Sequence, residues 1–492
     1  MITRRAFTAT LALAPLCTAQ ADNEWVELFD GKTLDGWRAS ENPATWKVED
    51  GLLVHDGPRS HLYYSGTVNN ASFRNFELEV EAQGAPLCNS GVYFHTVYLE
   101  KGFPRKGFEV QIENTAPGQT GYGERKKTGS LYAVRNTYKP MVADNEWFRM
   151  SVVVRGKNVQ VRVNGTLVAD YTESDPVYLP PGQGDRRFDQ GTFALQGHDP
   201  RAQVRFRKLR VRTLPDSVAT PGPIPVADDT FRSLVNLATT GIPVVDYHAH
   251  LKTGLTLEQL LAKGRRDGIQ YGVAVNAGKN HPVDTDAAAI QFVESMKGQP
   301  AFVAMQAEGR EWTQMFSRRA VARFDYVFTD SMTWTDNRGK RMRLWIPEEV
   351  GAIADPQEFM DTLVERTVGI LEHEPVDIYV SPTFLPAVIA ADYDRLWTEE
   401  RMGKVVAAAK SNNVAIELND RYKLPSERFA LMAKDAGCKF AFGTNNSSAT
   451  DLGRCEYGIK MVEACKLTGQ HFFVPGSAVP KAVERKGEAL RA

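Results

Sequence analysis

The N-terminal part of the chain consists of short runs in which apolar and polar residues alternate. Residues 76–83 (FELEVEAQ) and 151–156 (SVVVRG) are examples, and a period of two is typical of β-strands. Gly, Asn, Asp and Pro separate the runs, and Asn164-Gly165 lies between two of them, as a tight type I′ hairpin turn requires. Residues 24–214 show no sustained helical period. The pattern predicts an all-β domain of two packed sheets, a jelly-roll sandwich.

Two of these runs, within the stretch Ser90 to Asn114, carry polar rows of chemically active residues: Val92 and Phe94 alternate with Tyr93 and His95, and the second run alternates from Phe108 to Glu113. Their apolar positions predict one face on a core, and the alternate positions predict a second face. That second face would hold Tyr93, His95, Glu109, Gln111 and Glu113. A carboxylate, an amide, an imidazole and an aromatic ring suit the binding of a sugar and the removal of a proton from it. The alternative is an ordinary solvated sheet face.

From residue 242 the rhythm changes to apolar strand, amphipathic helix, apolar strand. Seven or eight such units, with strands that are apolar almost throughout, predict a parallel β/α barrel over residues 242–478. Residues 215–241 are rich in Pro and small polar residues, which is typical of an interdomain linker. Residues 479–492 are expected to form a tail. The fold class is therefore multidomain: an all-β jelly roll followed by an α/β barrel.

The first 21 residues have the composition of an export signal. Arg4-Arg5 precedes an apolar run from Ala9 to Leu16, and Ala19-Gln20-Ala21 offers a small-residue cleavage site. The paired arginines resemble a twin-arginine signal, so we expect a periplasmic or secreted protein. No later run is long enough to predict a membrane helix. With 59 basic and 60 acidic residues the net charge is −1, which does not favour nucleic acid as a partner.

Six segments of the N-terminal part resemble, in order, the 3-keto-disaccharide hydrolase family of lectin-like jelly rolls. They are ELFDGKTLDGW (27–37), SGVYF (90–94), GFEVQI (107–112), TGSLYAV (128–134), the Asn-Gly hairpin and the segment 194–214. The resemblance implies a carbohydrate substrate and cleavage of 3-keto-glycosides. Gly197 stands where the family more usually has an acidic residue, and the family also tends to have an Arg near His95.

In such a reaction a base removes the proton on C2, which the neighbouring ketone makes acidic, and the C1–oxygen bond then breaks. Glu109 is the predicted base. His198 is a candidate acid or metal ligand, or else a histidine at a loop tip. The predicted substrate-binding residues are Tyr93, His95, Gln111, Lys127, Arg135 and Gln196, with Lys127 and Arg135 steadying the enolate oxygen.

The barrel segments DYHAHL, QAEG (306–309) and AIELN (415–419) resemble the polymerase and histidinol phosphatase (PHP) family of metallohydrolases. The resemblance implies metal ligands at His248, His250 and Glu308. Other ligand positions of that family hold Asn276, Ser381 and Asn445 here. We therefore expect at most one divalent ion, zinc, manganese, iron or calcium. The alternative is a vestigial pocket of hydrogen-bonded histidines.

Three functions compete at this point. The first is an exported enzyme that cleaves 3-keto-glycosides or 3-keto-disaccharides in its jelly roll. The second is a metal-dependent hydrolase in the barrel, with the jelly roll as a carbohydrate-binding module. The third is a sugar-binding protein without catalysis. The loss of several metal-ligand positions favours the first over the second, and the sequence leaves the oligomeric state open.

Overall fold

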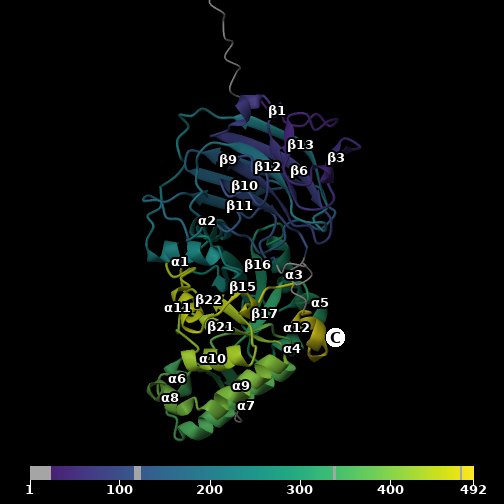
Figure 1. Cartoon of the computed structure of the whole chain (residues 1–492). Helices are drawn as coiled ribbons and strands as arrows, with labels where there is room; N and C mark the ends of the chain where they lie inside the picture. The colour runs from purple at the N-terminus through teal and green to yellow at the C-terminus, as the bar shows by residue number, and fades with distance from the viewer. Residues whose placement is uncertain (1–23, 116–123, 336–339, 477–478, 492) are drawn as a thin grey trace, which may run out of the picture.

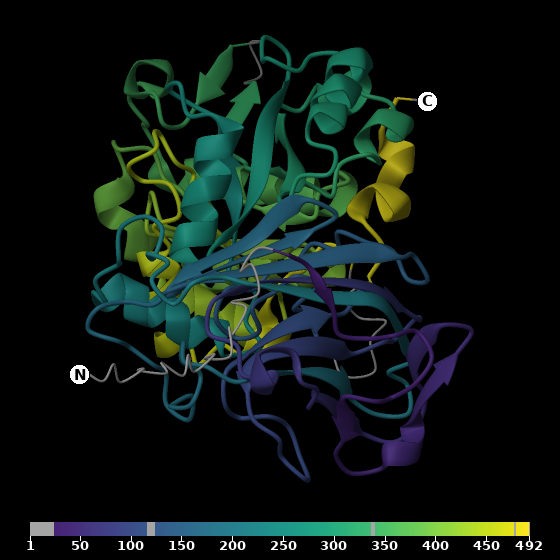
Figure 2. The same ribbon diagram turned by 90° about the horizontal axis from the view of Figure 1, so that it is seen from above.

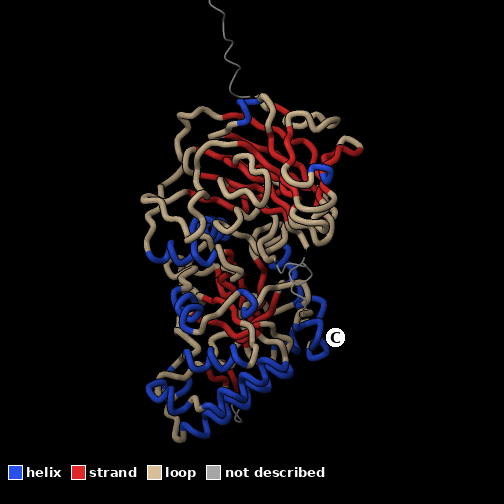
Figure 3. Tube along the Cα trace, in the orientation of Figure 1, coloured by secondary structure: helices blue, strands red, loops and turns tan. Residues whose placement is uncertain are grey.

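The computed structural model describes residues 24–115, 124–335, 340–476 and 479–491. It has a β-rich upper part and a lower part of strands surrounded by helices (Figures 1 and 3). The predicted signal peptide, residues 1–21, lies outside the described residues. Within the described residues no helix is long and apolar enough to cross a membrane.

The upper part is a sandwich of two antiparallel sheets. The larger sheet has the order β11-β10-β9-β6-β13-β4-β3, with β1 paired to β13, and the smaller sheet has the order β2-β5-β12-β7-β8. The strands are β1 (Val26–Glu27), β2 (Trp37–Ala39), β3 (Trp46–Glu49), β4 (Leu52–His55), β5 (Ser60–Tyr64), β6 (Phe76–Gly84), β7 (Ser90–Thr96), β8 (Phe108–Ile112), β9 (Phe148–Arg155), β10 (Asn158–Val163), β11 (Thr166–Thr172), β12 (Thr192–Gly197) and β13 (Val204–Thr213).

Strict alternation builds the core of this sandwich. Along β6 every second residue is buried, and Leu78 and Val80 face Phe94, Phe108 and other apolar residues of the smaller sheet. Burial of these side chains stabilises the domain by about 1.5–3 kcal/mol each. The other side of the smaller sheet is thereby left to the polar residues of the same strands. The jelly-roll prediction is confirmed.

The lower part contains a closed barrel of seven parallel strands. Its strands are β14 (Val245–His250), β15 (Gln270–Gly278), β16 (Phe302–Glu308), β17 (Tyr326–Thr329), β20 (Ile378–Tyr379), β21 (Ala415–Asn419) and β22 (Phe440–Gly443). The last apolar run that suggested an eighth unit joins the sheet only through a single bridge between Phe440 and Phe472. A separate hairpin is formed by β18 (Thr333–Thr335) and β19 (Arg341–Arg343).

Helices surround the barrel, and α7 and α9 pack against each other at the end far from the jelly roll (Figure 1). The helices are α1 (Asp229–Ala238), α2 (Leu257–Asp267), α3 (Asp286–Ser295), α4 (Trp312–Met315), α5 (Arg318–Val321), α6 (Pro347–Val350), α7 (Pro356–His373), α8 (Tyr393–Leu396), α9 (Glu399–Ser411), α10 (Glu427–Asp435), α11 (Glu456–Ala464) and α12 (Ala482–Lys486).

Two segments are more ordered than their composition suggested. The predicted linker contains α1, which Asp228 caps and which packs Leu234 and Leu237 into the barrel core. The predicted tail contains α12, which lies at the edge of the barrel near the C-terminus (Figure 2) and buries Val483. The backbone amide of Ala482 donates to Asp377 (2.7 Å). Apolar residues at helical spacing therefore prevail over the polar character of both segments.

The jelly roll rests on the amino ends of the barrel strands. Residues 125–139 contact Gln270, the first residue of β15, and Asp325, which directly precedes β17. Because the barrel strands are parallel, their carboxyl ends open on the opposite side, away from the jelly roll. We call that opening the barrel mouth.

Candidate functional site

The outer side of the smaller sheet carries a compact polar cluster, which we call the jelly-roll face. The register places Tyr93 opposite both Glu109 and Ala194, and Gln196 opposite His61. The predicted parity of β8 is confirmed, since Phe108, Val110 and Ile112 enter the core while Glu109 and Gln111 do not. Residues from four strands, β5, β7, β8 and β12, thus meet on one face.

Glu109 stands at the centre of this face in a fixed orientation. The hydroxyl of Tyr93 donates to its Oε2 (2.8 Å), and Nε2 of Gln196 donates to its Oε1 (3.0 Å). Gln196 also donates to the hydroxyl of Tyr93 (2.8 Å). A side chain at Gly91 would place its Cβ 2.6 Å from Oε1 of Glu109, so glycine leaves the space that this carboxylate occupies. Each carboxylate oxygen keeps a further lone pair for a ligand.

Burial raises the pKa of Glu109 to about 7, although the charge of Arg186 and the bond from Tyr93 oppose that rise. The charge of Glu124 adds to it. A carboxyl group that titrates near neutrality is a stronger base than an exposed glutamate and is still ionised in part. Glu109 therefore has the environment of a general base.

Several buried polar atoms on this face have no hydrogen-bond partner among the residues that the structure describes. They are both ring nitrogens of His61, the hydroxyl of Tyr63, Oε1 of Gln111 and Oε1 of Gln196. Unpaired buried polar atoms are costly, and their concentration in one place indicates a ligand site. Burial and the charge of Arg59 lower the pKa of His61 to about 3, so its imidazole is neutral. Its ring lies 5.7 Å from that of Tyr93.

His198 lies at the rim of the same face. Its ring is 5.1 Å from Phe103, which in turn is 5.6 Å from His61. The Nδ1 atom of His198 is 3.0 Å from Oδ2 of Asp199. Burial lowers its pKa. The rings of His198, Phe103 and His61 thus form a contiguous row that leads to Tyr93.

Gln111 and Lys127 sit at the other end of β8. Nε2 of Gln111 donates to Asn89 (2.9 Å), which leaves its oxygen free. The ammonium of Lys127 is fully buried, 3.7 Å from Oε1 of Glu113, and donates to the carbonyl of Thr115 (2.7 Å). Its charge is therefore balanced by Glu113 rather than directed at Glu109.

Two predicted site residues lie elsewhere. Between Tyr93 and Thr96, β7 carries one residue more than the facing part of β12, which makes a β-bulge. His95 lies in this bulge with a positive φ of 56°, and its side chain turns inward. Its Nε2 donates to the carbonyl of Arg74 (2.8 Å). Arg135 points into the barrel interface, where Nη2 donates to the carbonyl of Arg266 (3.0 Å) and the guanidinium covers the Tyr171 ring. Placing these two on the jelly-roll face was wrong.

Three contributors were not predicted. His61 follows the same alternation as Tyr63, opposite the core residue Leu62, so the parity of SHLYY could have revealed it. Arg186 comes from a loop without any pattern; its Nη1 donates to the carbonyl of Tyr132 (2.9 Å). The hydroxyl of Tyr132 donates to Glu124 (3.1 Å). These last two belong to the surroundings of Glu109 only through tertiary folding.

The barrel mouth holds a second cluster. Nδ1 of His248 donates to Oε1 of Glu417 (2.6 Å), and Nδ1 of His250 donates to the carbonyl of Ala274 (3.1 Å). Among the described residues, the Nε2 atoms of both histidines and Oε1 of Gln306 are buried without a hydrogen bond of ordinary geometry, although the side chain of Gln306 acts on His250. Glu308 accepts from Asn276 (2.6 Å), and burial raises its pKa.

This donor set suits a cation in part. Each histidine is held through Nδ1 and presents a bare Nε2, which is how metal-binding imidazoles are oriented. In this arrangement, however, the described residues contain no group of three His, Cys, Asp or Glu side chains that could hold a metal ion. His248 and His250 fit as two ligands, and the third position, assigned to Glu308, stays a prediction.

Comparison with known proteins concerns the jelly roll. Residues 24–212 match the 3-keto-alpha-glucoside-1,2-lyase-like domain family. A curated 3-keto-disaccharide hydrolase of Bacteroides thetaiotaomicron is 32% identical over an alignment that covers 30% of this chain and 58% of that protein. The chain thus spans just over half the length of this relative.

Solved structures give fainter likenesses. A Parabacteroides distasonis protein provisionally named a glycosyl hydrolase is 22% identical, covers 40% of this chain and 95% of its own, and has a TM-score of 0.34. The carbohydrate-binding module CBM66 of Bacillus subtilis is 14% identical, covers 36% and 96%, and has a TM-score of 0.25. The domain match and the curated relative are thus both similar to the jelly-roll part of this chain. The resemblance of the barrel to the PHP family stays a prediction.

Proposed function

We propose that this chain is an exported enzyme that cleaves 3-keto-glycosides, including 3-keto-disaccharides, on its jelly-roll face. The observation that carries the proposal is the state of Glu109: a buried carboxyl with a pKa of about 7, oriented by Tyr93 and Gln196. It lies among acceptors and donors that have no partner within the described part of the chain. The match of residues 24–212 to a 3-keto-glucoside lyase-like domain supports the choice of substrate.

The reaction follows from the acidity of the C2 hydrogen beside a C3 ketone. Glu109 takes this proton, and the electron pair delocalises into the ketone as an enolate. We assign the stabilisation of the enolate oxygen to Arg186, whose charge acts on Glu109. The C1–oxygen bond then breaks, its electrons leave with the aglycone oxygen, and His198 or water supplies a proton to that oxygen. Water added to the resulting unsaturated sugar at C1 makes the net reaction a hydrolysis.

A panel of 3-keto-glycosides and their unoxidised parents tests this function with the mature protein. We expect cleavage of the keto sugars alone, and slower cleavage when C2 carries deuterium. Product analysis separates elimination from net hydrolysis. Binding without turnover of any keto sugar would instead support the sugar-binding alternative, and cleavage of the unoxidised parents would contradict the C2 route.

A second candidate function concerns the barrel mouth. The two bare Nε2 atoms of His248 and His250 favour a bound divalent ion there, with Glu308 as the third ligand. When bound, such an ion would supply a Lewis acid. Elemental analysis of the full chain, compared with His248→Ala, tests this. We expect at most one ion per chain that the substitution removes; two or more tightly held ions would contradict the limit set by the lost ligand positions.

A further inference from the structure

We propose that the barrel holds part of the jelly-roll site in position, and that Gln270 of β15 is the positioning residue through which it acts. The part concerned is the site loop, residues 124–139. The consequence for catalysis rests on the function proposed above. The positioning itself rests on contacts within the protein.

The site loop forms one wall of the jelly-roll face. The backbone amide of Tyr132 donates to the carbonyl of Glu109 (2.9 Å), and the amide of Gln111 donates to the carbonyl of Ser130 (2.9 Å). In addition, the backbone amide of Gly129 donates a hydrogen bond to the carbonyl of Gln111 (3.0 Å). The loop thus serves as an extra partner for β8, the strand that carries the proposed base. A shift of the loop would move Glu109 or admit water beside it.

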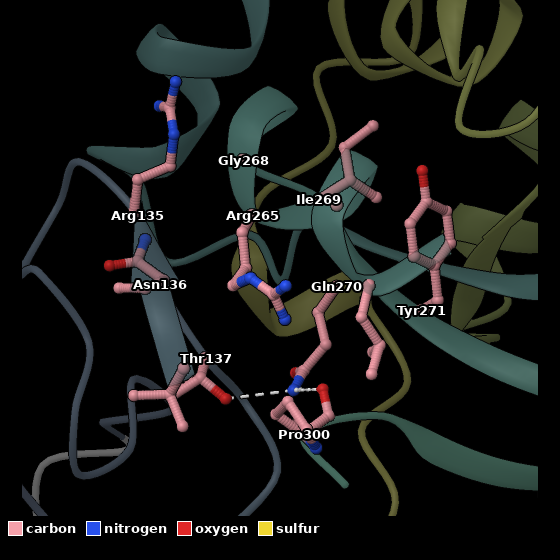
Figure 4. A pocket seen from close by; sticks show the side chains of 13 residues that line it. Arg135, Asn136, Thr137, Arg265, Gly268, Ile269, Gln270, Tyr271 and Pro300 are labelled. Atoms are coloured by element: carbon pink, nitrogen blue, oxygen red, sulfur yellow. Dashed lines mark hydrogen bonds between the residues drawn. The ribbon is translucent and has the colours of Figure 1, made fainter. Parts of the chain in front are cut away.

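Gln270 belongs to the barrel, yet most of its polar capacity is directed at this loop. Its Oε1 accepts from the amides of Tyr138 (2.7 Å) and Lys139 (3.2 Å). Its Nε2 donates to the hydroxyl of Thr137 (2.9 Å) and to the carbonyl of Pro300 (3.0 Å), as Figure 4 shows. Gln270 is buried, with 7% of the residue exposed. One amide therefore ties three consecutive loop residues to the barrel.

Thr137 and Ser130 connect Gln270 to β8, the strand that carries the proposed base. The amide of Thr137 donates to the hydroxyl of Ser130 (2.9 Å), and that hydroxyl donates to the carbonyl of Lys127 (2.7 Å). The carbonyl of Ser130 also accepts a hydrogen bond from the backbone amide of Gln111. Gln270, Thr137, Ser130 and β8 thus form one continuous hydrogen-bonded path from the barrel to the site.

Two further contacts hold the site loop against the barrel. Nδ2 of Asn136 donates to the carbonyl of Ala238 (2.9 Å), and the ammonium of Lys139 contacts Asp325 (3.0 Å). A cavity of about 30 Å³ remains between the loop and the barrel beside Gln270. These contacts join the loop to the barrel on both sides of Gln270.

Gln270→Met tests the proposal, because methionine keeps the volume of glutamine and removes all four hydrogen bonds. We expect kcat to fall about 10- to 100-fold, as small misplacements of catalytic groups do, with KM changed far less. The acid limb of the pH profile should move below pH 7, toward the ordinary value of a glutamate, since water would reach Glu109. Hydrogen exchange should accelerate in segments 108–113 and 128–139.

Tyr178→Phe is the matched control. It deletes another interdomain hydrogen bond, from Tyr178 to Asn236 (2.8 Å), that does not touch the site loop, and it should leave kcat, the pH profile and both exchange rates unchanged. Unchanged exchange in Gln270→Met, or faster exchange with unchanged kcat, would overturn the positioning role. A wild-type chain inactive on every 3-keto-glycoside would overturn the proposed function instead, and exchange alone would then decide whether the barrel orders the loop.

Discussion

The jelly-roll face and the barrel mouth use the same residue types in opposite ways. On the jelly-roll face Glu109 receives two hydrogen bonds from side chains and keeps a raised pKa of about 7. In the barrel mouth the carboxylate of Glu417 accepts hydrogen bonds from His248, from the backbone amide of Ser381 (2.6 Å) and from the side chain of Asn419 (2.8 Å). In the proposed function the first carboxylate accepts a proton, whereas the second holds a histidine through its Nδ1. Composition alone therefore does not distinguish a base from a support.

The sharpest test of this contrast is Glu109→Gln beside His248→Ala. The first substitution keeps the shape and removes the basicity, and general-base catalysis contributes about two to four orders of magnitude in rate. We expect kcat for a 3-keto-glycoside to fall by about that factor, while His248→Ala has a far smaller effect. If the barrel substitution abolishes activity and Glu109→Gln is nearly silent, the two regions have been assigned in the wrong order.

Lys127→Met probes the buried ion pair that flanks the site. Removing one partner of a buried pair leaves the other uncompensated, which costs about 3 kcal/mol of the free energy of unfolding. Both side chains of the Lys127–Glu113 pair are fully buried. Lys208→Met breaks the more exposed pair with Glu81 and should cost below about 1 kcal/mol. Denaturant unfolding measures both; equal losses would show that burial of the pair is unimportant.

The pH dependence of kcat/KM separates the two regions further. Glu109 acts as its carboxylate, so activity should rise about tenfold per pH unit on the acid side and level off above the pKa of about 7 that burial produces. Protonation below that value removes the base. His248→Ala should retain this profile. An acid limb near pH 4 in the wild-type chain would mean that Glu109 is solvated or is not the base.

Asn446→Ala is expected to have the smallest effect, and only on the barrel. The buried Asn446 accepts the amide of His250 (2.7 Å) and donates to its carbonyl (3.1 Å). Losing this support should lower the free energy of unfolding by about 1–2 kcal/mol and leave keto-sugar cleavage unchanged. A large loss of cleavage would indicate that the barrel mouth takes part in the reaction.

Alternation was sufficient to predict the main architecture and part of the site. The period of two along β8 placed Glu109 and Gln111 correctly because a regular strand sends alternate side chains to opposite faces. The near-continuous apolar runs predicted the parallel barrel for the corresponding reason. These are local rules, and they hold wherever the backbone is regular.

The errors occur where the backbone is irregular or the partner is distant in sequence. A bulge in β7 turned His95 inward, and no pattern in SGVYFHT marks that extra residue. Arg135 was assigned to the sugar because it flanks a family motif, but its partner, Arg266, is 131 residues away. Arg186 reaches the surroundings of Glu109 from a loop. Such placements depend on the packing of the whole chain.

The seating of the jelly roll on the amino ends of the barrel strands has a consequence for transport. Gln270 lies at one end of β15, and the bare nitrogens of His248 and His250 lie at the other end of the barrel. Any product released from the jelly-roll face and used at the barrel mouth would have to travel through bulk solvent around the protein. We therefore expect the fusion to act through the contacts of the site loop with Gln270 and Asp325 rather than by direct transfer of a product.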